Sequence, residues 1–505
     1  MKILGISASL RNARRGTGND TLIQDIMQAS TEEQMHHFIE QEAALHLKNF
    51  EEAGRKENLP FDEMYTNLKK QKGNKGLSNS EVALVSALWS VKEFGVEIDH
   101  VSLAEYFTES GEKNLDELKN KLMDADGYIL STPVYFGDRG SLSQSLIDMI
   151  RADEALKNSF KGKLYAGIAV GAKRNGGQET TLIYQLMDML NVGALGVGND
   201  SETTSQYGGT GVAGDVGTMP KDKYGLDTSM GTGRRIARVV RLMEMAKGYD
   251  MEAKPKVQFW ILQDKNDVAE KYIEQLIPHI PGIDATIVNL GSEYIMRCLG
   301  CDICPTHIDV DEEYRCIIKS KKDAFLDIHE LFTEADAIIP VVFSPKNRNG
   351  LVTNYQKFLE RTRYLRRGDY VFSDLLVAPF IIDELGSNEN LHIRLVTSMI
   401  RHHTIMSQPL ISFYNKGAFL NTDDIVKELK DVSKLITMTT IGRVRLYSED
   451  MGEMNYNPVG YVLSVIKDNE DQKLNKRKQM IEDRIERIKS KLVHIVDSKE
   501  KNAAN

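Results

Sequence analysis

All four cysteines of this 505-residue chain lie in one short stretch, at Cys298, Cys301, Cys304 and Cys316. The first three follow the spacing C-x2-C-x2-C, and thiolates at this spacing can converge on one soft metal centre, because each short connector lets the backbone turn around it. Such a centre would carry electrons. Since the chain has no other cysteine, a disulfide scaffold is disfavoured and a reducing compartment, the cytoplasm, is expected.

Composition narrows the function classes further. The formal net charge of -9 gives no signature of a nucleic-acid-binding protein, and the 41% of hydrophobic residues can build several cores. The longest apolar runs, such as residues 375–382, are strand-sized, whereas a membrane-spanning helix needs about 20 apolar residues. We therefore expect no nucleic-acid partner and no membrane segment.

The first half reads as strands alternating with helices, which is typical of a parallel sheet covered on both faces. Residues 2–9 form a buried-type strand, and a polar loop of hydroxyls, glycines and arginines leads to a helix that begins near Thr21. Such a loop can offer backbone N–H groups and the positive end of a helix to a phosphate. Asn19, Asp20 and Thr21 are also good capping residues, so an ordinary polar turn explains the same pattern.

Two later strands end in segments suited to a flat ligand. Residues 127–131 lead into Thr-Pro-Val-Tyr-Phe-Gly, and residues 164–171 lead into Arg-Asn-Gly-Gly-Gln-Glu. Ligands of doubly wound sheets bind beyond the carboxyl ends of the strands, and paired glycines let a ring approach the backbone closely. The glycine-rich residues 208–217 are interpreted as a further loop of this site, after the fifth strand. Residues 31–90 are predicted to be a helical insertion that acts as a lid, a dimerisation arm or packing.

Three of these segments together resemble the flavodoxin-like NAD(P)H-dependent FMN reductases and quinone reductases over about residues 1–245. They are, in order, the polar loop after the first strand, the Thr-Pro-Val-Tyr-Phe-Gly segment and the Arg-Asn-Gly-Gly-Gln-Glu segment. The resemblance implies bound FMN, with NAD(P)H as co-substrate and no catalytic side chain that we can name. The residues that it places near the FMN phosphate are Ser7, Ser9, Arg11, Thr17, Gly18, Asn19 and Thr21. Those along the two sides of the flavin ring are Pro133, Val134, Tyr135, Phe136 and Gly137, and Asn175, Gly176, Gly177 and Gln178.

The second half repeats the first, because residues 122–133 align with residues 331–345 and similar helices follow. We therefore predict an α/β protein of two tandem flavodoxin-like, doubly wound parallel-sheet domains, at residues 1–250 and 255–447. A helical C-terminal extension would follow at residues 448–505. The first strand of the second domain ends in a loop with two carboxylates, which repel a phosphate, so this domain is predicted to be degenerate and the chain to carry one FMN.

The cysteine stretch follows the second strand of the second domain, residues 285–290. This placement resembles the iron-sulfur flavoproteins and implies a [4Fe-4S] cluster held by Cys298, Cys301, Cys304 and Cys316. The longer gap before Cys316 keeps a structural zinc site and a metal-free vestige open as alternatives.

The function that this resemblance implies is a flavin-dependent oxidoreductase. Electrons would pass from NAD(P)H through FMN to an acceptor, either a flavin, a quinone or a protein, and the iron-sulfur cluster would be a relay. The resemblance also suggests a homodimer. The alternatives are a dedicated electron-transfer protein for a larger redox enzyme, with no small substrate of its own, and a scaffold that has lost its cofactors.

Overall fold

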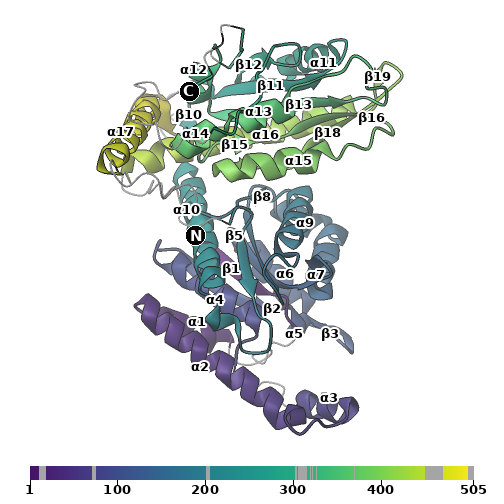
Figure 1. Ribbon diagram of the computed structural model, residues 1–505, viewed down its shortest axis with the longest axis vertical. Coiled ribbons are helices and arrows are strands. Elements are labelled where there is room, and N and C mark those ends of the chain that lie inside the picture. The colour runs from purple at the N-terminus through teal and green to yellow at the C-terminus, as the bar shows by residue number, and fades with distance from the viewer. Residues whose placement is uncertain are drawn as a thin grey trace. The chain divides into compact units, whose positions relative to one another are not determined.

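The computed structural model describes residues 1–10, 19–70, 76–200, 205–301, 304, 316–318, 320, 322–325, 327–368, 370–449 and 470–498. It divides into two compact units, Met1–Val240 and Arg241–Asn505 (Figure 1). No helix within these described ranges is both long and apolar enough to cross a bilayer.

The first unit is built on a parallel sheet with the strand order β2-β1-β5-β7-β9. Counted in sequence this is the order 2-1-3-4-5 of the doubly wound, flavodoxin-like fold. The strands are almost fully buried, as expected when helices cover both faces of a parallel sheet. Their bounds are β1 Lys2–Ser7, β2 Glu97–Ser102, β5 Gly127–Tyr135, β7 Leu164–Gly171 and β9 Gly209–Val212.

Helices cover the two faces of this sheet (Figure 1). On one face α4 and α10 pack together so closely that a Cβ added to Gly233 would lie 2.2 Å from the carbonyl oxygen of Ala87. On the other face lie α6, α7 and α9. The bounds are α4 Asn79–Lys92, α6 Leu115–Asp124, α7 Ser141–Ala152, α9 Gln178–Asn191 and α10 Lys223–Ala246.

The region predicted to be an insertion has two parts in the structure. Its first part contains α2 (Glu32–Phe50), the π-helical η1 (Glu51–Arg55) and α3 (Phe61–Lys70). Its last part is α4, which connects to β2 and is buried along residues 80–91. Because α4 packs on the strands, it is the crossover helix of the fold, and the added segment ends before it.

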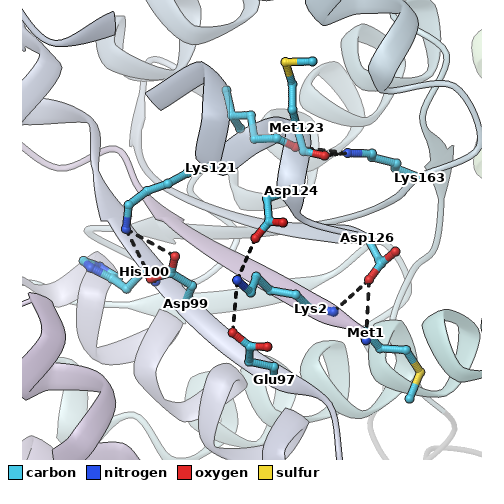
Figure 2. A network of polar contacts seen from close by, with 11 residues as sticks. Met1, Lys2, Glu97, Asp99, His100, Lys121, Met123, Asp124, Asp126 and Lys163 are labelled. Carbon is cyan, nitrogen blue, oxygen red and sulfur yellow. Dashed lines mark hydrogen bonds and ion pairs between the residues drawn. The ribbon is translucent and has the colours of Figure 1, made fainter. Parts of the chain in front are cut away.

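Ion pairs and hydrogen bonds fix the strand starts at the amino edge of the sheet (Figure 2). The Nζ atom of Lys2 lies 2.7 Å from Asp124 and 3.0 Å from Glu97, which joins β1 to the residues before β5 and to β2. These hydrogen bonds raise the pKa of Lys2, and the bond from Lys2 lowers the pKa of Asp124. The network lies at the edge opposite to the carboxyl ends of the strands, where the predicted site residues are.

The second unit repeats the same topology. Its parallel strands have the order β12-β11-β13-β16-β18, again 2-1-3-4-5 in sequence. The C-terminal helix α17 (Glu470–Lys489) packs on α16 (Thr422–Glu449) through a core of Val444, Tyr447, Ile485 and Ile488. The strand bounds are β11 Lys256–Asp264, β12 Asp284–Asn289, β13 Ala337–Ser344, β16 Phe380–Glu384 and β18 Leu410–Asn415.

The contact between α4 and α10 gives a stability prediction. Gly233→Ala should lower the free energy of unfolding by about 1–3 kcal/mol, because the new methyl group meets a backbone oxygen that cannot move aside. Chemical denaturation measures the change. Gly282→Ala is the matched control, since its nearest atom would lie 3.9 Å away, and it should change stability by less than about 1 kcal/mol. Equal effects of the two substitutions would contradict the proposed packing.

Candidate functional site

A row of serines crosses the carboxyl edge of the first sheet. Ser102, Ser7 and Ser131 lie in register on β2, β1 and β5, and all three are fully buried. Ser131 donates a hydrogen bond of 2.7 Å to the carbonyl oxygen of Ser80, at the start of α4. The hydroxyls of Ser7 and Ser102 have no hydrogen-bond partner among the described residues. Buried hydroxyls are nearly always satisfied, so this edge has polar capacity for a ligand.

The helix that begins over this edge is α4. Ser78 caps it, because the backbone N–H of Glu81 donates to the Ser78 hydroxyl while the Glu81 carboxylate accepts from the Ser78 N–H, at 3.4 and 3.3 Å. The cap satisfies the N–H of Glu81, whereas the N–H groups of Asn79 and Ser80 have no carbonyl partner within the helix and form part of its positive end, which can bind an anion. Asn79 and Ser80, the first residues of α4, therefore join the candidate phosphate site.

Sequence reasoning missed Ser78, Asn79 and Ser80. The signal that could have found them is the capping box, in which serine is followed three residues later by glutamate, directly before a long apolar run.

Of the residues of the first loop that were predicted to lie near the FMN phosphate, those that the structure describes are divided between the end of β1 and the start of α1. Ser7 ends β1 and Ser9 is buried just beyond it. Asn19 and Thr21 are in the first turn of α1 (Asn19–Gln28), whose end is held beside α4 by hydrogen bonds from Trp89 and Lys92 to Ala29. The predicted Arg11, Thr17 and Gly18 lie outside the described residues.

The segment after β5 is a tight hairpin. Val134 pairs with Arg139 across a two-residue turn formed by Phe136 and Gly137, and both turn residues have positive φ, 53° and 80°. A left-handed backbone at a bulky residue costs on the order of 1 kcal/mol or more, so the surrounding structure must hold it. At the base of the hairpin, the Thr132 hydroxyl accepts a 3.2 Å hydrogen bond from the Gly140 N–H and so stabilises the turn. The hairpin presents Phe136 fully exposed at its tip.

The segment after β7 folds against this hairpin. Gly177 has a φ of 106°, and a Cβ added there would lie 2.6 Å from the Cα of Gly137. Gln178 is buried, and its amide donates to the carbonyl oxygens of Lys173 and Gly211, at 2.8 and 3.2 Å. The structure therefore brings the two predicted ring-facing segments together, and the Gln178 side chain shapes the loop.

The glycine-rich residues 208–217, predicted to be a loop after the fifth strand, contain that strand itself, because Gly209–Val212 form β9. The loop that follows β9 completes the edge. The Asn79 side chain donates to the carbonyl oxygen of Asp215 at 2.8 Å and accepts from the N–H of Met219 at 3.2 Å. On its other side Asp222 accepts from the N–H of Val212 and pairs with Arg174 of the β7 loop, at 2.7 and 2.5 Å. Four chain segments thus meet at the edge of one sheet. They offer a helix start, a buried hydroxyl and a close glycine contact, which together fit a flat cofactor with an anionic tail.

The same edge of the second unit does not fit such a cofactor. There the Asp264 carboxylate accepts from the N–H groups of Ala269 and Glu270, at 3.0 and 3.2 Å, in the first turn of α11 (Val268–Leu276). Glu389 accepts a 2.7 Å hydrogen bond from Ser344 and is paired with Arg348. Asp264 thus takes up first-turn N–H groups that a phosphate would need, whereas the Glu81 carboxylate at the α4 start accepts from the cap residue Ser78.

No disulfide joins the four cysteines of the second unit, all of which lie within the described residues. Cys301 is exposed, while Cys298, Cys304 and Cys316 are partly buried, and the Cys298 sulfur lies 3.9 Å from Nη1 of Arg363. Within the part of the chain that the structure describes, no three His, Cys, Asp or Glu residues are gathered closely enough to hold a metal ion.

Comparisons with known proteins agree with the fold class. The NADPH-dependent FMN reductase family matches residues 73–206, a span that begins just before α4. An iron-sulfur flavoprotein of Methanocaldococcus jannaschii is 35% identical over 182 residues, which cover 33% of this chain and 92% of that protein. An NAD(P)H dehydrogenase (quinone) of Solidesulfovibrio magneticus is 29% identical over 132 residues, covering 24% of this chain and 64% of that protein.

Among solved structures, a WrbA-like flavodoxin from Agrobacterium tumefaciens overlaps 32% of this chain and 89% of its own, with 17% identity and a TM-score of 0.25. This overlap is too weak to add to the strand order. The fold, the site and the sequence matches define an NAD(P)H-dependent flavin oxidoreductase. The chain belongs to the NADPH-dependent FMN reductase family, together with the iron-sulfur flavoproteins that it matches.

The contact between hairpin and turn gives a second prediction. Gly177→Ala should lower the free energy of unfolding by about 1–3 kcal/mol and weaken flavin uptake, because alanine is strained at this φ and its methyl group would push Gly137 away. Denaturation and flavin titration measure the two effects. Gly214→Ala, in the β9 loop, is the control, because its nearest atom would lie 3.7 Å away. Unchanged uptake in Gly177→Ala would mean that this contact does not shape the site.

Proposed function

We propose that the first unit binds FMN at the carboxyl edge of its sheet and uses NAD(P)H to reduce an acceptor of the quinone type. The observation that carries this proposal is the meeting of the α4 start with the loops after β5, β7 and β9. The names of the relatives, which include quinone dehydrogenases and iron-sulfur flavoproteins, support the same donor and cofactor.

In this proposal the chain holds and orients the cofactor. Backbone N–H groups of the first turn of α4 and the Ser7 hydroxyl bind the phosphate. The hairpin from Pro133 to Gly137 and the turn from Asn175 to Gly177 would lie along the ring. The N–H of Gly176 donates to Gln178 Oε1 and to the Lys173 carbonyl, so other backbone N–H groups of the two segments would face the charge that develops on the ring. When bound, FMN supplies the hydride acceptor and the capacity for one- or two-electron transfer. Ser9, Asn19 and Thr21 remain predicted phosphate contacts.

The open side of the site suits a second flat molecule. Tyr135 is about half exposed and Phe136 is fully exposed on the hairpin. Aromatic side chains of this kind stack on rings. We propose that the nicotinamide and the acceptor use this side in turn.

Charge placed at the α4 start tests the phosphate assignment. Ser80→Asp should weaken FMN binding at least about tenfold, because a carboxylate a few ångströms from the phosphate repels it. Ser80→Asn is the control, because asparagine has nearly the shape of aspartate without its charge. This variant should retain most of the affinity for FMN. Titration of the apoprotein with FMN and with riboflavin measures the effect, and riboflavin should bind both variants alike because it lacks the phosphate.

Two outcomes would contradict this proposal. If the wild-type protein takes up no FMN, the function fails as a whole. If Ser80→Asp and Ser80→Asn bind FMN equally, the phosphate lies elsewhere.

We further propose that the cysteine segment of the second unit holds an iron-sulfur cluster that passes electrons from the flavin to the acceptor. Four thiols gathered in one segment are the donor set of such a cluster, and the half-buried Cys298 lies beside the positive Arg363, which suits an anionic centre. Zinc and a metal-free segment remain the alternatives. A dedicated electron carrier without a small substrate is the alternative for the whole chain.

Elemental analysis tests the cluster. After anaerobic reconstitution with iron and sulfide, the wild-type protein should contain both, and Cys298→Ser or Cys301→Ser should lose most of them because each removes a thiolate ligand. Arg363→Lys, which keeps all four thiols, is the control and should retain iron. Iron content that is unchanged in both serine variants would exclude this site, and zinc in place of iron would support the structural alternative.

A further inference from the structure

The added segment between β1 and α4 reaches the phosphate end of the site. The backbone N–H of Leu77 donates to the carbonyl oxygen of Glu42 at 3.2 Å, and a Cβ added to Gly76 would lie 2.9 Å from the backbone nitrogen of His46. These contacts place α2 against the chain that enters α4, directly before the Ser78 cap.

The same segment contacts the loop after β9. Nη2 of Arg55, at the end of η1, lies 2.5 and 2.7 Å from the two carboxylate oxygens of Asp215. Gly217, two residues after Asp215 in the loop, has a φ of 73°. A Cβ added to it would lie 2.8 Å from the carbonyl oxygen of Ala43 in α2. Only glycine allows this close approach of the loop to the helix.

Asp215 therefore connects two parts of the molecule. Its carbonyl oxygen accepts from the Asn79 side chain, in the first residue of α4, and its carboxylate binds Arg55 of the added segment. The loop is also held by Arg174 through Asp222, but that contact lies within the α/β body. Arg55 is a charged contact from the added segment to this loop.

We propose that Arg55 is a positioning residue that, through Asp215, holds the β9 loop closed over the phosphate of bound FMN and so slows its release. This inference rests on the proposed FMN site. The pair is partly exposed, with side-chain exposures of 36% for Arg55 and 54% for Asp215. Exposed pairs are weak, so the loop can still open. Arg55 also balances a carboxylate that would otherwise add negative charge near the phosphate.

The FMN dissociation rate tests this role. In the FMN-loaded protein, Arg55→Ala should release FMN about three to ten times faster than the wild type, which is the range expected for losing one well-formed Arg–carboxylate pair at a surface. Asp215→Asn should act in the same direction, and the double variant should be no faster than the faster single variant, because both remove the same contact. Arg55→Lys should restore part of the retention.

A neighbouring ion pair provides the matched control. Lys56 pairs with Glu51 at 2.8 Å within the added segment, and in the described residues it forms no ion pair with the loop. Lys56→Ala should therefore leave the FMN dissociation rate unchanged. Riboflavin, which lacks the phosphate, should dissociate at the same rate from the wild type and from Arg55→Ala, whereas a general loosening of the site would accelerate both ligands.

The outcomes separate this inference from the proposed function. If the wild type binds FMN and Arg55→Ala releases it at the wild-type rate, the role of Arg55 is wrong and the FMN site stands. If Arg55→Ala accelerates riboflavin as much as FMN, the residue does not act at the phosphate end and the inference is also wrong. If Arg55→Ala does not fold, as thermal denaturation would show, Arg55→Lys and Asp215→Asn decide the question. No FMN binding by the wild type would overturn the function itself.

Discussion

The structure depends on the burial of the start of α4 against the carboxyl edge of the first sheet. Ser131 donates to the carbonyl oxygen of Ser80, and the Ser78 capping box fixes the first turn, so the unpaired N–H groups of the helix are held where three loops also end. A helix start in water would be solvated and would bind an anion weakly. At a buried edge lined by the Ser7 hydroxyl, its positive end is the candidate anion site on which the proposed function rests.

The second unit shows what happens when the same topology lacks this constraint. Its strand order is identical, but the Asp264 carboxylate accepts from the first-turn N–H groups of α11 and satisfies the helix start internally. At the neighbouring strand ends, the Glu389 carboxylate accepts a hydrogen bond from Ser344 and forms an ion pair with Arg348. One doubly wound scaffold thus supports a ligand site in one unit and a closed polar edge in the other. The chain that leads to the cysteines leaves β12 at this same edge, where a Cβ added to Gly291 would lie 3.2 Å from the Cβ of Asp264.

Sequence reasoning worked best where the signal is local. The segments around Phe136 and Gly177 were predicted to follow two strands whose apolar runs are clear. The structure adds that the first is a hairpin and that the two are in contact. The acidic loop of the second unit was also readable, because a carboxylate disfavours a phosphate wherever that loop folds. The α4 start was not among the predicted site residues, because Asn19 and Ser78 are both residue types that cap helices, and only packing shows that α4 begins beside Ser131.

The sequence by itself determined the class of the protein, the two α/β halves and the segments that follow β5 and β7. These depend on short-range patterns of burial and turn chemistry that the chain carries wherever it folds. Only the tertiary structure decided which helix start meets the serine row, how Gln178 shapes its loop, and that Arg55 of the added segment reaches Asp215. The physical reason is that these contacts join residues far apart in the chain, and their partners are chosen by packing of the whole unit.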